Sequence, residues 1–145
     1  MAGILFIVLQ FIRPVQNKNG LVLSTDISKV IIIPDTVRTL LKDACFDCHS
    51  NNTDYPWYSN IQPMGWLMAY HIKEGKNQLN FSDFGNYSQR RQLSKLDGIA
   101  NSLKDDIMPL KSYKIMHKSA QLSTGEKSLL INWAQQSIDS LLVSK

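Results

Sequence analysis

The sequence predicts an all-α domain of four or five short helices with an extended arm in front of it. Apolar residues recur at intervals of three and four over several separate stretches, a spacing that places them on one face of a helix. Proline, glycine and asparagine gather between these stretches, as is typical of loops. Because loops make up much of the 145-residue chain, we expect the helices to pack around a cofactor.

Residues 1–20 consist of an apolar run and a polar linker. Gln10 is the single polar side chain within residues 2–12, and Arg13-Pro14 ends the run. A helix over this run would be about 16 Å long, whereas the hydrocarbon core of a bilayer is about 30 Å thick. We interpret residues 1–20 as the remnant of a signal sequence or signal anchor with its linker, and residues 1–12 as a candidate membrane tether.

The arm and the first helix come next. Residues 21–33 are predicted to be extended, and Pro34 ends them. The main domain, residues 34–145, opens with a helix whose start signals are Pro34 and Asp35. Its apolar face consists of Val37, Leu40, Leu41, Ala44 and Cys48. The following stretch, residues 51–63, is rich in asparagine, proline and aromatic residues and is predicted to be a loop.

Two further helices are expected in the middle of the chain. The second predicted helix runs from Met64 to about Lys73, with Gly75 as its C-terminal cap. The third begins near Ser88 and ends before a break at residues 106–110. Its apolar side is made by Leu93, Leu96, Ile99, Ala100 and Leu103.

The last predicted helix begins at Ser123. Ser123 and Glu126 have the spacing of a capping box, in which each side chain bonds the other residue's backbone N–H. The apolar face of this helix consists of Leu130, Trp133, Ala134 and Leu141.

The most informative motif is Cys45-Phe46-Asp47-Cys48-His49, which contains the only two cysteines of the chain. Cys-x-x-Cys-His is the attachment signature of c-type haem. Two thiols on one helical turn can each form a thioether to a vinyl group of the same porphyrin. The histidine that follows is then held below the iron, where its imidazole can be the proximal ligand. We therefore predict one haem c per chain, bound through Cys45 and Cys48, with His49 as proximal iron ligand.

Three other interpretations of the cysteine pair stay open. A disulfide between Cys45 and Cys48 would close a very short loop and contribute little entropic stabilisation. A thioredoxin-like redox pair belongs to an α/β pattern, which this sequence lacks. Structural zinc needs four ligands, and the remaining histidines, His71 and His117, lie far from the motif and from each other in the sequence.

Met108 is the predicted distal iron ligand. It lies in the break between two helices, and Pro109 biases it toward extended backbone, so that its thioether can be presented from a loop. His71 is the alternative ligand. Core filling is expected instead for the methionines on predicted helical faces, which are Met64, Met68 and Met116.

Further short strings accompany the motif. They are Ser50-Asn51, Tyr55-Pro56-Trp57-Tyr58, Trp66, His71-Ile72, Leu79-Asn80-Phe81, Met108-Pro109-Leu110, Tyr113, His117 and Leu122-Ser123. Together with Cys45–His49 they resemble the bacterial haem-binding domain family common in Bacteroidetes, over residues 25–136. The resemblance implies a cytochrome c-like haem domain that is exported and often tethered to a membrane. The order of elements is also similar to that of small class I cytochromes c.

Composition and charge limit the classes of function that the chain can have. The net charge of +4 is mild, and no lysine or arginine run with interleaved aromatic residues suggests a nucleic-acid partner. The sequence contains no paired acids or nucleophile triad that would form a substrate site. We therefore expect a mono-haem electron carrier and not an enzyme. The alternative is a haem enzyme with peroxidase-like activity, or a gas or redox sensor, with an open or labile sixth iron site.

The expected partner and compartment follow from charge and from haem chemistry. The lysines around the predicted distal loop can steer an acidic redox protein toward the haem edge; they are Lys104, Lys111, Lys114 and Lys118. Haem is attached covalently outside the cytoplasm in bacteria. We therefore expect a periplasmic or periplasm-facing protein, anchored to the inner membrane through residues 1–12.

Overall fold

The computed structural model describes residues 2–143; the predictions for residue 1 and for residues 144–145 lie outside this range. Within it the chain is helical, and an isolated bridge between Lys18 and Asn52 is the only β-type pairing, which confirms the all-α prediction. The longer α-helices are α1 (Ala2–Leu9), α3 (Asp35–Leu41), α5 (Met64–Gln78), α6 (Gln89–Lys104) and α8 (Thr124–Val143). The shorter ones are α2 (Ile27–Val30), α4 (Asp47–His49) and α7 (Lys111–Met116).

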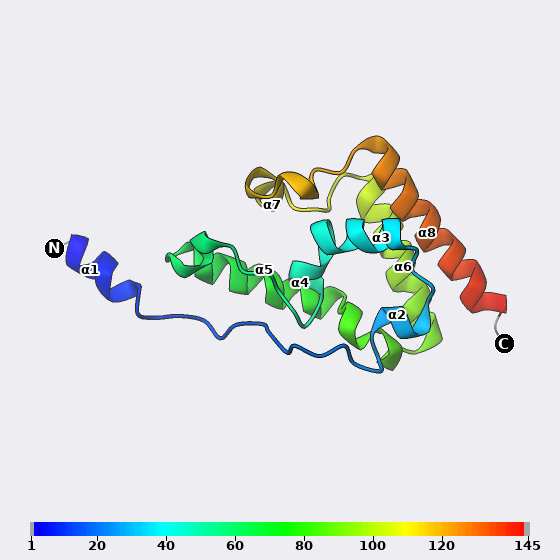
Figure 1. Ribbon diagram of the computed structural model, residues 1–145, viewed down its shortest axis with the longest axis horizontal. Coiled ribbons are helices and arrows are strands. Elements are labelled where there is room, and N and C mark those ends of the chain that lie inside the picture. Colours follow the sequence, from blue (N-terminus) through cyan, green and yellow to red (C-terminus); the bar gives the residue numbers. More distant parts are fainter. Residues whose placement is uncertain (1, 144–145) are drawn as a thin grey trace.

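Helices α6 and α8 lie antiparallel at one end of the molecule, with α3 packed on them (Figure 1). Their facing sides bury Leu96, Leu130 and Trp133, and the indole N–H of Trp133 donates to the carbonyl of Ile32 at 3.1 Å. Phe81 and Phe84, from the 3₁₀ helix η3 (Phe81–Asn86), complete the core. The predicted apolar faces of these two helices are therefore the faces that pack.

The first predicted helix, over residues 35–48, exists as three consecutive segments. Between α3 and α4 the chain forms a π-helical turn, η1 (Lys42–Phe46), in which each hydrogen bond spans five residues instead of the four of an α-helix. Cys45 lies in this turn, whereas Cys48 and His49 lie in α4. The two cysteines are thus on one continuous helical path, as the spacing predicted.

The extended arm contains one helical turn that the prediction missed. The carboxylate of Asp26 accepts a hydrogen bond from the backbone N–H of Ser28 at 2.9 Å and caps α2. This turn buries Ile27, and the extended residues after it bury Ile31 and Ile33. An Asp before the apolar run was the available signal, since Asp is a preferred N-cap residue.

Helix α5 is longer than predicted, and Gly75 does not cap it. The backbone N–H of Leu79 donates to the carbonyl of Gly75 at 2.8 Å, so that the helix continues to Gln78. A Cβ on Gly75 would lie 2.6 Å from the carbonyl oxygen of Cys48. The glycine therefore allows α5 to pass close to α4, which is a packing role and not a terminating one.

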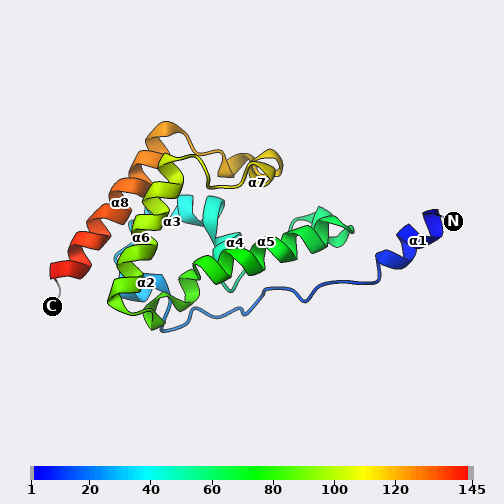
Figure 2. The ribbon, with the colours of Figure 1, turned by 180° about the vertical axis from the view of Figure 1, so that it is seen from behind.

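The N-terminal segment crosses the molecule along α5 and ends in α1, away from the α6–α8 pair (Figure 1, and from behind Figure 2). The indole N–H of Trp66 donates to the carbonyl of Ile12 at 2.8 Å, and the Asn17 side chain bonds the Ser50 carbonyl at 2.8 Å. Lys76 donates to the Asn17 side chain at 2.7 Å. These bonds attach the segment to α5 and to the loop after His49. None of the described helices is both long and apolar enough to cross a bilayer.

Candidate functional site

His49 is held by the carbonyl of Leu79. Its Nδ1 lies 3.0 Å from that oxygen, which can only accept, so Nδ1 carries the proton and Nε2 keeps its lone pair. The ring of Phe81 lies edge-on to the imidazole, with centroids 6.2 Å apart. Burial lowers the pKa of His49, while backbone hydrogen bonds to Leu79 and Gly75 oppose that shift. A neutral imidazole with its second nitrogen oriented by a carbonyl is the form in which histidine binds metals.

Two adjoining cavities meet at the motif. They have volumes of about 370 Å³ and 410 Å³, and His49, Cys45 and Met108 line both. The first extends between α4, α5 and α7 and is also lined by Cys48, His71 and Tyr113. The second extends toward α6 and is also lined by Leu103 and Leu130. His49 and Met108, which belong to segments far apart in the sequence, are therefore brought to the same space.

Both cysteines are free thiols in the structure. Burial, and then the neighbouring Cys48, raise the pKa of Cys45 to about 12. Burial, and then the charge of Asp47, raise the pKa of Cys48 to about 11. Both side chains are accordingly protonated at neutral pH, with no tendency toward the thiolate that a thioredoxin-like redox pair uses. Neither the disulfide nor the thioredoxin-like interpretation gains support.

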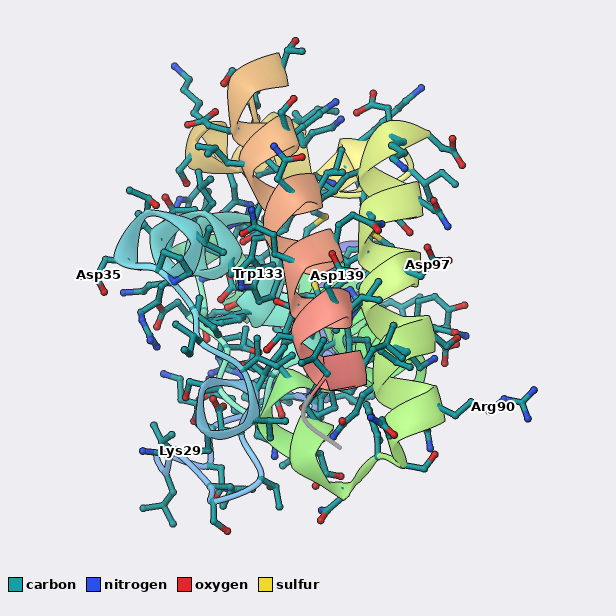
Figure 3. The ribbon with its side chains drawn as sticks, turned by 90° about the vertical axis from the view of Figure 1, so that its right-hand side faces the viewer. Lys29, Asp35, Arg90, Asp97, Trp133 and Asp139 are labelled. Atoms are coloured by element: carbon teal, nitrogen blue, oxygen red, sulfur yellow. The ribbon has the colours of Figure 1, made fainter. Side chains whose placement is uncertain are left out.

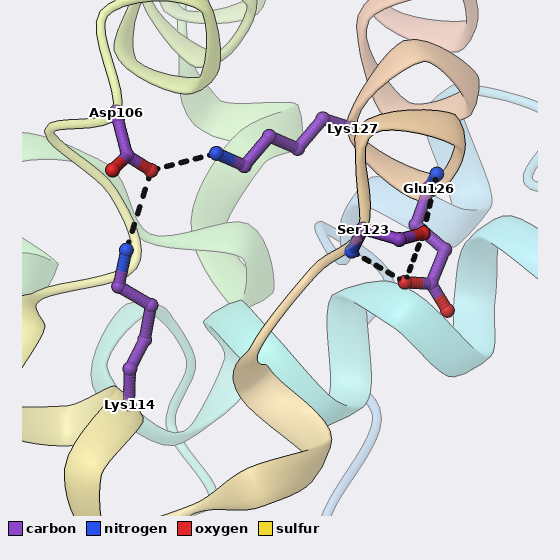
Figure 4. A network of polar contacts seen from close by, with 5 residues as sticks. All are labelled: Asp106, Lys114, Ser123, Glu126 and Lys127. Atoms are coloured by element: carbon purple, nitrogen blue, oxygen red, sulfur yellow. Dashed lines mark hydrogen bonds and ion pairs between the residues drawn. The ribbon is translucent and has the colours of Figure 1, made fainter.

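Met108 lies in the loop between α6 and α7, as predicted. Its backbone N–H donates to the carbonyl of Ser102 at 3.2 Å. Asp106, in the same loop, has a φ of 53°, in the left-handed region that Asp tolerates better than most residues. Its carboxylate forms ion pairs with Lys114 at 3.2 Å and Lys127 at 2.7 Å (Figure 4). These pairs attach the loop to α7 and α8.

Figure 4 also shows the predicted capping box at the start of α8. The carboxylate of Glu126 accepts from the backbone N–H of Ser123 at 2.7 Å, and the backbone N–H of Glu126 donates to the Ser123 hydroxyl at 3.3 Å. Helix α8 therefore begins where the sequence predicts it, close to the ion pairs that hold the Met108 loop.

The remaining histidines have different surroundings. His71, on α5, lines the first cavity but not the second. His117 lines neither of them; its ring stacks on Tyr113 with centroids 3.9 Å apart, and its Nε2 lies 3.3 Å from the hydroxyl of Tyr58. His71 therefore stays within reach of a group bound beside His49, whereas His117 belongs to an aromatic cluster between α7 and the loop 51–63.

The other methionines do not fill the core. Met64, Met68 and Met116 line a shallow third cavity of about 60 Å³, and Met64 and Met116 are exposed. The expected core role is wrong for Met64 and Met116, because the face of α5 that carries Met64 is covered only in part by α7.

Three functional contacts were not predicted. The hydroxyl of Tyr113 donates to the carboxylate of Asp47 at 2.6 Å, which attaches α7 to the residue between the two cysteines. The Leu79 carbonyl orients His49, and Gly75 admits the Cys48 backbone. An acidic residue inside the motif was a possible signal for the first contact. The other two have no local signal, since they depend on the path of the chain.

The site residues fit a covalently bound haem. The cavities are apolar near the cysteines and lie within the size range of ligand sites in proteins. An imidazole nitrogen and a thioether sulfur line the same space, and both are iron ligands in cytochromes c. For zinc the donors are too few: within residues 2–143 no three His, Cys, Asp or Glu side chains come together in a metal-binding arrangement.

Comparison with known families agrees with this fit. The sequence profile of the haem-binding domain family matches residues 4–136, which is most of the chain. No curated protein and no solved structure matches the chain significantly. Because the family match spans well over half of the sequence and includes every residue of the site described above, the chain belongs to the haem-binding domain family.

Proposed function

We propose that the protein is a mono-haem, c-type cytochrome-like electron carrier, with one haem c attached through Cys45 and Cys48. The observation that carries this proposal is the position of His49 and Met108. They line the same two cavities from different segments, and Nδ1 of His49 is occupied by the Leu79 carbonyl. A haem between them has two protein ligands and no open position, which leaves electron transfer as its chemistry.

The residues of the site have separate roles in this proposal. Cys45 and Cys48 are protonated thiols, the form whose S–H can add across a vinyl group without releasing a leaving group. His49 would hold the haem iron through Nε2, and Met108 would hold it through its sulfur. Haem c, when bound, supplies a one-electron Fe(III)/Fe(II) couple. The apolar side chains that line the two cavities would favour a higher reduction potential than an exposed haem has.

Covalent attachment is tested on the full chain produced in an export-competent host with the haem-maturation machinery. We expect the mass of one haem added to the chain, still present after denaturation, and a pyridine haemochrome spectrum of the thioether type. Replacing Cys45 or Cys48 by Ser should shift this spectrum toward that of a haem with one free vinyl group. An unmodified mass from that host would contradict the proposal.

A haem enzyme or gas sensor is the second candidate, and one observation favours it. The loop that carries Met108 is held by ion pairs of an exposed carboxylate, Asp106, and His71 lines the first cavity beside it. Displacement of Met108 would leave His71 as a distal acid or base. Rapid, tight binding of CO to the reduced protein would support this candidate, whereas slow or weak binding would support the electron carrier.

The proposed carrier acts on the periplasmic side of the inner membrane, with residues 1–12 as its tether. Supporting this are the exposed apolar side chains of α1 and the compartment that haem attachment requires. Fractionation should place the holo-protein in the periplasmic or membrane fraction, and recovery in the cytoplasm would contradict the proposal.

An acidic redox protein is the proposed partner. Lys104, Lys111 and Lys118 are exposed near the Met108 loop, whereas Lys114 is paired with Asp106. Steering by these lysines predicts that the rate of reduction by an acidic donor falls as ionic strength rises. A rate independent of salt would contradict it.

A further inference from the structure

An exposed apolar face lies at the end of the molecule opposite the α6–α8 pair. Its side chains come from the 3₁₀ helix η2 (Trp57–Asn60) and the residue after it, from the start of α5 and from α7; they are Trp57, Ile61, Met64, Leu67, Ile115 and Met116. Trp57 is 74% exposed and Ile115 76% exposed. None of the six lines either of the two large cavities, and Met64, Leu67 and Met116 line the shallow third cavity, which Cys48 also lines. We call this set the apolar face.

The three elements of the apolar face form one surface. Met64, Leu67 and Met116 line the same shallow cavity, which joins α5 to α7. Ser112 lines it too, and Ile115 and Met116 follow Ser112 at the three- and four-residue spacing of one helix face. The hydroxyl of Tyr58 reaches His117 at 3.3 Å, which connects η2 to the end of α7.

Helix α1 is attached to the same end of the molecule. The backbone N–H of Gln62 donates to the Gln10 side chain at 2.8 Å, and Trp66 donates to the Ile12 carbonyl. In both ribbon views α1 lies beyond the start of α5, on the side away from α6 and α8 (Figures 1 and 2). The apolar side chains of residues 4–8 are exposed, Phe6 among them, and so is Phe11 just after the helix. Helix α1 therefore extends from the same end of the molecule that carries the apolar face.

Helices α1, η2 and α7 carry no carboxylate of their own. Residues 2–13, 55–73 and 107–118 supply α1, η2, the first turns of α5 and α7, and they contain none of the twelve acidic residues of the chain, although Asp106 forms an ion pair with Lys114. Their charged side chains are Arg13, Lys73, Lys111, Lys114 and Lys118. Exposed apolar and aromatic side chains beside the exposed cations Lys111 and Lys118 match the surface of a bilayer that contains anionic lipids.

We propose that the apolar face docks on a lipid bilayer with anionic headgroups, next to α1. Trp57 is amphipathic and suits the headgroup region, while Ile115 and Leu67 suit the acyl boundary. The nearby α1 favours a bilayer over a protein partner, because the apolar interior of one bilayer can cover both α1 and the apolar face. Cys48 lines the same shallow cavity as Met64 and Met116, so docking places the haem attachment site beside the membrane. The proposal concerns the position of the domain and holds whether or not the haem transfers electrons.

The test is co-sedimentation of the full-length holo-protein with vesicles of phosphatidylcholine, with and without phosphatidylglycerol. Two double variants change the face: Trp57→Asp with Ile115→Asp, and Lys111→Glu with Lys118→Glu. Loss of two apolar anchors should weaken partition at least about tenfold. Reversal of two cations should weaken it at least about tenfold on phosphatidylglycerol vesicles, with little effect on phosphatidylcholine alone.

Matched controls lie at the other end of the molecule. Ile32→Asp changes an apolar side chain that is 90% exposed between α2 and α3. Lys29→Glu with Arg90→Glu reverses two exposed cations on α2 and α6, and Figure 3 shows Arg90 extending away from its helix. Both controls should partition as the unaltered protein does. Haem content of each variant, from its haemochrome spectrum, separates a failure of docking from a failure of haem binding.

Two outcomes would overturn the proposal. In the first, both face variants keep full haem content and partition unchanged, while Phe6→Ser with Phe11→Ser abolishes partition; α1 alone then binds the membrane. In the second, the lysine variant leaves partition unchanged but removes the salt dependence of reduction by an acidic ferredoxin; the face is then a protein-docking surface. The lysine variant keeps the test decisive even if the Trp57 and Ile115 variant fails to fold, because exposed lysines do not contribute to the core.

Discussion

Gly75 of α5 lies so close to Cys48 of α4 that an added Cβ would be 2.6 Å from the Cys48 carbonyl oxygen and 3.2 Å from its Cβ. The two nearest obstructing atoms, the carbonyl oxygen and carbon of Cys48, are backbone, so they cannot move aside as a flexible side chain can. The contact places α5 directly against the segment that carries both cysteines and His49.

Replacing Gly75 by Ala should therefore destabilise the fold by about 1–3 kcal/mol, the usual cost of overpacking, and reduce haem incorporation. Chemical denaturation and the haem-to-protein ratio measure the two effects. Gly125→Ala is the matched control: Gly125 has open space around its Cα on α8, and the change should be neutral or stabilising by up to about 1 kcal/mol. Equal behaviour of the two variants would mean that α5 does not need this close approach.

Met108 and His71 compete as distal ligands, and their variants should differ. Met108 lines both cavities with His49, whereas His71 lines only the first. We expect Met108→Ala to remove the weak near-infrared sulfur-to-iron charge-transfer band, to lower the reduction potential and to speed CO binding, with haem still attached. His71→Ala should leave the low-spin spectrum unchanged. Loss of that spectrum in His71→Ala, with Met108→Ala unaffected, would reverse the assignment.

Tyr113 should make the fold sensitive to alkaline pH. Burial, and then the hydrogen bond to Asp47, raise the pKa of Tyr113. The folded state thus holds the phenol proton more tightly than the unfolded state, whose tyrosine pKa is about 10. This stabilisation is fully present below that pH and is lost as pH rises through the higher folded pKa.

Replacing Tyr113 by Phe should lower the free energy of unfolding at neutral pH by about 1–2 kcal/mol, since a hydrogen bond to a charged group is lost. The decline of stability above about pH 10 should also become shallower. Denaturation of the holo-protein across this pH range measures both, with Tyr70→Phe, an exposed tyrosine, as control. If the alkaline decline is the same in both variants, Tyr113 is not its source.

Asp106 should govern the position of Met108 more than global stability. Hydrogen bonds from Lys127 and Lys114, and then their charges, lower the pKa of Asp106. Its ion pairs are therefore complete at neutral pH and weaken as pH falls through the lowered pKa. We expect Asp106→Ala to change unfolding free energy little but to accelerate CO binding to the reduced protein, because the loop is released from α7 and α8. Asp105→Ala, at the adjacent exposed carboxylate, should leave CO binding unchanged; equal acceleration in both would indicate a general charge effect.

Local patterns along the sequence determined the helices. Three stretches of three- and four-residue apolar spacing correspond to α3–α4, α6 and α8. The Ser123–Glu126 capping box places the start of α8 to the residue, because a cap is formed by groups three positions apart. The Cys-x-x-Cys-His motif likewise lies within one short helical path and needs no tertiary information to be recognised.

Where the prediction failed, contacts between distant residues decided the outcome. The position of Gly75 after an apolar stretch predicts the end of a helix, yet the helix continues to Gln78. Because Gly75 has no Cβ, the Cys48 backbone can pack against it. Residues 21–33 read as extended, yet burial of Ile27 against the core accompanies a helical turn capped by Asp26. The role of Gly75 does not follow from neighbouring residues, whereas Asp26 was a local capping signal for the turn.

The sequence by itself therefore determined that the chain is helical and that Cys45, Cys48 and His49 form a haem-attachment motif. Only the tertiary structure decided that Leu79 orients the imidazole, that Tyr113 binds Asp47, and that Met108 reaches the space beside His49. The physical reason is the distance along the sequence between the groups that interact. Periodicity and capping depend on groups within one or two helical turns, whereas these contacts depend on how separate helices pack.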